Sequence, residues 1–135
     1  MTDRIALVLA LLLTAPLAAA DPRPPLEGVS AVRISNYGAP SVLIEDRARM
    51  GPLVSELNTM RKRSWQRGET RLACYSTLVV LKGKRTAALY RIGADTIVER
   101  SQDKGESSYT LAVPLAEMPR IAALLTQIPL ASRCN

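Results

Sequence analysis

Alternating apolar and polar positions indicate several β-strands along the chain. Residues 29–35 (VSAVRIS) alternate with a period of two, which is typical of a half-buried strand. Turn-forming residues 36–40 (NYGAP) separate this run from 41–45 (SVLIE), so the two runs are expected to pair as a hairpin. The run 71–82 is apolar on both faces at 78–81, and it therefore belongs in the middle of a sheet that a helix covers.

Three more strands are expected after this central one. Gly83 and Lys84 suit a two-residue hairpin turn with glycine at its first central position. Residues 102–108 (QDKGESS) form a polar loop before the last strand. The three strand-like runs are 85–92, 96–101 and 109–113.

Two segments have the three- and four-residue apolar spacing of a helix. The first covers about 50–62, with Asp46 as a candidate cap and Pro52 in its first turn. The second covers about 115–128 and ends before Pro129. The order is strand, strand, helix, four strands, helix. It predicts an α+β fold, an antiparallel sheet of five to six strands with two helices packed on one face.

The first 20 residues are typical of a secretory signal. An apolar run ends in three alanines, a small-residue pattern that a signal peptidase accepts. This run is shorter than the roughly 20 residues of a membrane-spanning helix. We expect an exported protein, periplasmic in a Gram-negative bacterium and secreted otherwise, with no transmembrane segment in the mature chain. The predicted organisation is a signal peptide at 1–20, a Pro-rich extended spacer at 21–28 and a single domain at 29–135.

Cys74 and Cys134 are the only two cysteines of the chain. An exported protein with an even number of cysteines commonly pairs them, so we predict one disulfide bond between these two. The bond would close a loop of 60 positions and stabilise the fold by roughly 4 kcal/mol. The alternative, a reactive Cys74 thiolate, lacks a histidine or a CxxC partner to activate it. No metal site or cofactor is expected.

The chain is basic and contains no histidine. It has 18 Lys and Arg against 12 Asp and Glu, a formal net charge of +6. Removal of residues 1–20 takes away one residue of each sign, so the charge stays at +6. Without histidine, Ser–His and Cys–His nucleophile pairs are excluded. Because nucleic acid is not the usual partner of an exported protein, we expect an acidic protein surface or an anionic membrane or polymer instead.

The segment 61–71 is the most unusual part of the chain, with five basic residues and one acidic residue around Trp65. Arginine forks beside an aromatic ring suit phosphate or carboxylate groups. The alternative is a solvated helix end with Trp65 folded back onto the core. A second basic group surrounds the Gly83 turn, and the sequence leaves open whether the two groups share one face. The candidate binding surface comprises Arg61, Lys62, Arg63, Trp65, Arg67, Arg71, Lys82, Lys84 and Arg85.

Three functional hypotheses follow. The first is a small non-catalytic exported binding or accessory protein that acts on a protein partner. The alternative is a binder of an anionic surface, such as lipid headgroups, lipopolysaccharide or a wall polymer, through segment 61–71. The third is a hydrolase without histidine, using Cys74, paired carboxylates or a serine with Lys104 as base. Because an exposed lysine stays protonated at neutral pH, we favour no enzyme activity.

Overall fold

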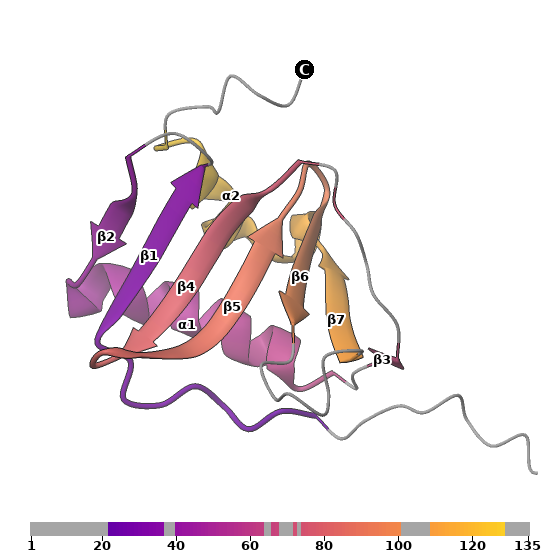
Figure 1. Cartoon of the computed structure of the whole chain (residues 1–135), viewed down its shortest axis with the longest axis horizontal. Coiled ribbons are helices and arrows are strands. Elements are labelled where there is room, and N and C mark those ends of the chain that lie inside the picture. The colour runs from indigo at the N-terminus through magenta and orange to yellow at the C-terminus, as the bar shows by residue number, and fades with distance from the viewer. Residues whose placement is uncertain are drawn as a thin grey trace, which may run out of the picture.

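Seven antiparallel strands form one sheet in the described part of the chain, and two helices cover one of its faces (Figure 1). The computed structural model describes residues 22–36, 40–63, 66–67, 72, 74–100 and 109–128. Across the sheet the strand order is β2-β1-β4-β5-β6-β7-β3. The strands are β1 (Ala31–Asn36), β2 (Val42–Ile44), β3 (Gln66–Arg67), β4 (Ser76–Lys82), β5 (Arg85–Ile92), β6 (Thr96–Arg100) and β7 (Tyr109–Pro114). The helices are α1 (Arg47–Arg61) and α2 (Pro119–Leu125), with a 3₁₀ turn at Leu115–Glu117.

The predicted α+β class, with an antiparallel sheet and two helices, is confirmed. The sheet exceeds the expected five to six strands because the two-residue strand β3 adds to the edge beside β7. Within the helix layer, α1 begins three residues earlier than expected. Asp46 caps it as predicted, since the Asp46 carboxylate accepts a hydrogen bond of 3.0 Å from the Ala48 N–H.

The central strand and the second helix differ most from their predicted bounds, and each difference has a physical cause. The central strand begins at Ser76 rather than at residue 71, because both neighbouring strands end level with Ser76: Asn36 of β1 and Ile92 of β5 are its partners. The second predicted helix is interrupted at Met118, whose backbone (φ −124°, ψ 62°) is not helical. A proline disfavours helical geometry in the residue before it, and Pro119 follows here.

The core lies between the sheet and the helices. One row of inward-facing residues crosses four neighbouring strands in register: Ile34 of β1, Leu78 of β4, Tyr90 of β5 and Glu99 of β6. All four are buried, and α1 packs against the sheet with the fully buried Leu57. Three of the four residues in this row are ordinary core side chains. Glu99 places a carboxylate in the same layer, which requires partners of its own.

The segment 22–30 contains no helix or strand but packs along one end of the layers (Figure 1). Leu26 is buried in the core, and Ser30 donates its N–H to the Leu81 carbonyl at 2.9 Å. Gly28 lies between them with a φ of +64°, a conformation that glycine adopts without strain. The expected spacer at 21–28 thus contacts the domain along the described part of its length. We call residues 22–30 the N-terminal strap.

Several predictions concern residues outside the described part of the chain. These are the signal peptide at 1–20, Trp65, Arg71 and Cys134. The disulfide bond therefore stays a prediction; Cys74 itself is half-buried just before β4. Within the described ranges, no helix has both the length and the apolar character needed to cross a membrane.

Candidate functional site

A buried polar network joins the C-terminal end of α1 to the sheet. Arg61 follows Leu57 by four positions, so both side chains lie on the face of α1 that packs on the sheet. Arg61 is only 8 % exposed. A buried guanidinium needs an anion and further hydrogen-bond acceptors to offset the loss of water.

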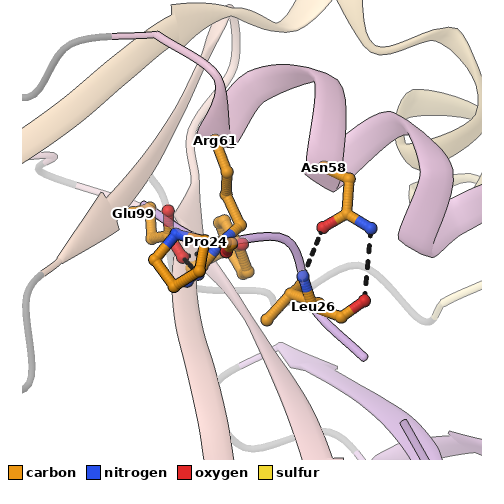
Figure 2. Close-up of polar contacts among 6 residues, drawn as sticks. Pro24, Leu26, Asn58, Arg61 and Glu99 are labelled. Carbon is orange, nitrogen blue, oxygen red and sulfur yellow. Dashed lines mark hydrogen bonds and ion pairs between the residues drawn. The ribbon is translucent and has the colours of Figure 1, made fainter. Parts of the chain in front are cut away.

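Glu99 and Pro24 supply these partners (Figure 2), and Tyr90 binds Glu99 in turn. The Arg61 guanidinium forms an ion pair with Glu99 through Nη1 and donates from Nε to the Pro24 carbonyl at 2.9 Å. The Tyr90 hydroxyl donates to the same Glu99 oxygen, Oε1, at 2.8 Å. The network thus connects α1, β5, β6 and the N-terminal strap.

Burial dominates the electrostatics of this network. It raises the pKa of Glu99 above its ordinary value, while the nearby Arg61 charge acts in the opposite direction. The pKa of Tyr90 is also raised well above its ordinary value, first by burial and then by the Glu99 charge. Glu99 Oε2 is buried without a hydrogen-bond partner among the described residues.

A carboxyl group with a raised pKa is a feature of many catalytic acids. In this protein the Glu99 side chain is 2 % exposed, and its second oxygen is enclosed as well. A substrate therefore has no contact with either oxygen in this structure. The arrangement connects the strap to the core, and we assign the network a structural role.

Asn58 fixes the next part of the strap. Its side-chain Oδ1 accepts from the Leu26 N–H at 2.6 Å, and its Nδ2 donates to the Leu26 carbonyl at 3.3 Å (Figure 2). Farther along, the Gly83 N–H donates to Ser30 Oγ at 2.9 Å. Hydrogen bonds thus join the strap to Arg61, to Asn58 and to the hairpin of β4 and β5.

The structure separates the residues of the candidate binding surface. Arg61 is a correction, because its side chain is buried against Glu99 rather than exposed. Lys62 and Arg63 are exposed at the end of α1, where Arg63 pairs with Glu117 at 2.8 Å. Arg67 lies in the edge strand β3. The three cations around the hairpin turn, Lys82, Lys84 and Arg85, are exposed.

The two predicted basic groups lie at the same end of the sheet. Arg67 pairs with Tyr109 at the start of β7, and the start of β7 lies beside the end of β6. This is also the end where β5 begins at Arg85, after the hairpin turn. Strands β6 and β7 separate β5 from β3, which gives three strand spacings or about 14 Å. The groups share an end of the molecule without being adjacent in the sheet.

The charged side chains are distributed unequally between the interior contacts and the surface. Several acidic groups are engaged within the fold: Asp46 caps α1, Glu99 binds Arg61, and Glu56 accepts from the Arg120 and Ile121 N–H groups at 2.7 and 2.9 Å. The exposed acidic side chains are Glu27, Glu45, Asp46, Asp95 and Glu117. The exposed basic side chains are Arg33, Arg47, Arg49, Lys62, Arg63, Lys82, Lys84, Arg85 and Arg120.

Sequence reasoning missed the roles of Asn58, Tyr90 and Glu99. A signal for Glu99 exists, because it follows Ile97 by two positions in a strand and therefore shares its inward face. A signal for Arg61 is its four-residue spacing from Leu57. Neither signal identifies the partner, which lies 38 positions away along the chain.

Comparisons with protein-family models, curated proteins and solved structures found no match to this chain.

Proposed function

We propose that this chain is a small, exported, non-catalytic binding or accessory protein that acts on an acidic surface of a protein partner. The observation that carries the proposal is the distribution of charge. Nine basic side chains of the described residues are exposed against five acidic ones, while Glu56 caps α2 and Glu99 binds the buried Arg61. A surface of this kind attracts negative partners and repels positive ones.

The mixture of exposed side chains supports a protein as the partner. Leu43 is 50 % exposed on β2, beside the exposed Arg33 with which it pairs in register. Tyr75 is 38 % exposed, and the Arg91 guanidinium lies 4.8 Å from the centre of its ring. Arginine and aromatic residues are enriched at protein–protein interfaces, and their apolar parts add contact area that does not depend on charge.

The alternative is binding to an anionic membrane or polymer through segment 61–71. Two observations favour it: Lys62 and Arg63 are exposed next to one another, and Arg67 lies in the edge strand. The structure weakens this alternative in one respect, since Arg61 is buried and does not contribute to such a surface.

Export is also part of the proposal, and with it the disulfide bond between Cys74 and Cys134. Such a bond would connect the C-terminal residues to the start of β4. Mass spectrometry after alkylation under non-reducing conditions tests it. An unalkylated chain whose mass is two hydrogens below that of the reduced chain supports the bond, and alkylation of both cysteines contradicts it.

The proposed function is tested by recovering a tagged full-length chain from the exporting host at low and at high salt. A specific protein retained at both salt concentrations is the expected result. Material retained only at low salt supports the anionic-surface alternative, because screening weakens contacts between exposed charges. Retention of nothing at either salt concentration contradicts both. The double variant Lys84→Gln/Arg85→Gln removes two of the nine exposed basic side chains and leaves the helices unchanged, so it measures what the hairpin turn contributes to retention.

A further inference from the structure

A hollow lies on the helix layer, where α1 and α2 run side by side. Its volume is about 210 Å³, and its floor is formed by the buried side chains of Ile44, Leu53 and Leu124. Arg49, Arg120 and Gln127 line it as polar residues. The two arginines are exposed to solvent.

Two contacts fix how the helices are aligned around this hollow. Near one end, Arg49 of α1 donates to Gln127 Oε1, just beyond α2, at 3.3 Å. Near the other end, Glu56 of α1 binds the Arg120 N–H at the start of α2. The helices are therefore antiparallel, and seven residues separate the two contacts on each chain segment. At 1.5 Å per residue this separation is about 10 Å.

The arginines consequently lie near opposite ends of an apolar floor. Arg49 belongs to the Gln127 end, and Arg120 belongs to the Glu56 end. The Glu56 carboxylate accepts two backbone hydrogen bonds from the first turn of α2, so it is engaged in capping that helix. The side chains of Arg49 and Arg120 thus supply two positive charges to the lining of a hollow whose floor is apolar.

We infer that this hollow docks an acidic amphipathic helix of the protein partner. Acidic side chains of that helix would face Arg49 and Arg120, which belong to different helices and lie about 10 Å apart along the helix axes. Apolar side chains three and four positions from an acidic one lie on the same helical face and would contact the floor. Docking a helix in an apolar groove is a common mode of peptide recognition.

The charge of the occupant follows from complementarity. A basic helix would bring like charges against Arg49 and Arg120. The chain's own residues 129–135 follow α2 directly, but their sequence contains an arginine and no acidic side chain. An acidic segment of another protein fits both the apolar floor and the two cations.

The inference rests on the proposed function. Site-specific photocrosslinking distinguishes a failure of the docking site from a failure of the proposed function. A benzoylphenylalanine is placed at Ala123, which lines the hollow, or at the exposed Ala87 of β5 as the control position. The full-length chain is irradiated in the exporting host, and the crosslinked peptide is sequenced by mass spectrometry. The expected adduct forms at position 123 and contains an acidic segment with apolar residues three and four positions apart.

Charge variants complete the test. The double variant Arg49→Gln/Arg120→Gln should lower the yield of the adduct about tenfold, since both cations face the partner's acids. Arg49→Lys/Arg120→Lys keeps the charges and should retain most of the yield.

The inference is overturned by an unchanged yield in the glutamine variant, or by an adduct from this chain's own residues or from a segment without acidic residues. Crosslinking at Ala87 but not at Ala123 overturns the docking site and leaves the proposed function standing. No adduct at either position, together with no retained partner, contradicts the proposed function itself.

Discussion

Arg49 and Arg61 lie on the same helix, twelve residues apart, in opposite environments. Arg61 is buried, where a carboxylate, a backbone carbonyl and a tyrosine complete its network. Arg49 is exposed, and its guanidinium donates a hydrogen bond of 3.3 Å to the side-chain oxygen of Gln127. The comparison shows that the identity of the side chain does not decide its role. Groups brought from distant segments bury one of these arginines and leave the other exposed to solvent.

Replacing Arg61 should have the largest effect on stability. Arg61→Met leaves the Glu99 carboxylate buried without its cation and removes the donor to the Pro24 carbonyl. Breaking a buried ion pair by removing one partner costs about 3–5 kcal/mol. Urea unfolding of the variant and of the native chain measures this difference. A loss below about 1 kcal/mol would show that the pair is not essential.

The double variant Arg61→Met/Glu99→Leu sharpens this first result. It removes both charges together, so neither is left buried alone, and it should recover part of the stability lost in Arg61→Met. The Tyr90 hydroxyl then loses its acceptor, which keeps the recovery incomplete. A double variant less stable than Arg61→Met would contradict this account of the network.

The pH dependence of stability tests the same carboxyl group. Its pKa is raised in the folded chain, so its contribution to stability is complete below the ordinary value of 4.5 and is lost as the pH rises through the folded pKa. Arg61 faces this carboxyl and partly offsets the loss, as does the charge of Arg23. In Glu99→Gln this contribution is absent. The stability of the native chain relative to the variant should therefore decrease between pH 4.5 and neutral pH, and an increase would contradict the raised pKa.

Asn58→Ala should destabilise the strap by about 2 kcal/mol. The substitution leaves the Leu26 N–H and carbonyl without their partners in a part-buried site. Hydrogen exchange at the Leu26 amide should increase together with the loss of stability. Asn58→Asp keeps an acceptor for the Leu26 N–H, but it removes the donor to the Leu26 carbonyl and adds a negative charge, so it should also destabilise the strap. An Asn58→Ala variant as stable as the native chain would contradict this role of Asn58.

Glu56→Ala should have a smaller effect, about 1 kcal/mol. Its carboxylate accepts from two N–H groups at the start of α2, where it acts as a cap supplied by another helix. Glu56→Gln keeps an acceptor and should lose less. Thermal unfolding distinguishes the two variants, and an unchanged midpoint for Glu56→Ala would show that the cap does not stabilise α2.

The smallest effect on stability is expected at the open end of α1. Arg49→Gln/Arg120→Gln changes two exposed side chains, and such changes alter stability by about 0.5 kcal/mol or less. The same urea titration measures it. A loss comparable to that of Arg61→Met would remove the distinction between the two ends of the helix.

The parts of the fold that depend on local pattern were predictable. The bounds of β5 were correct, because it lies between a glycine turn and Gly93; Gly83 has the positive φ, +62°, that such a turn requires. The start of β4 was not, because the neighbouring strands β1 and β5 both end level with Ser76. A strand ends where its partners end, and those limits are set by other parts of the chain.

In the candidate site, too, local features were predictable and contacts with distant segments were not. We placed Arg61 in one binding surface with the basic residues that follow it, because they are neighbours along the chain. Its structural partners, Glu99 and Pro24, lie 38 and 37 positions away. Periodicity places Arg61 and Glu99 each on an inward face, but only the packing of α1 on β5 and β6 brings them into contact.

The most direct test of the docking hollow compares partner retention by Arg49→Gln/Arg120→Gln and by the native chain, with the stability of both measured on the same samples. We expect the variant to unfold at the same urea concentration as the native chain and to retain about tenfold less partner. Native retention by a fully folded variant would contradict it, since the exposed end of α1 would then have no part in binding.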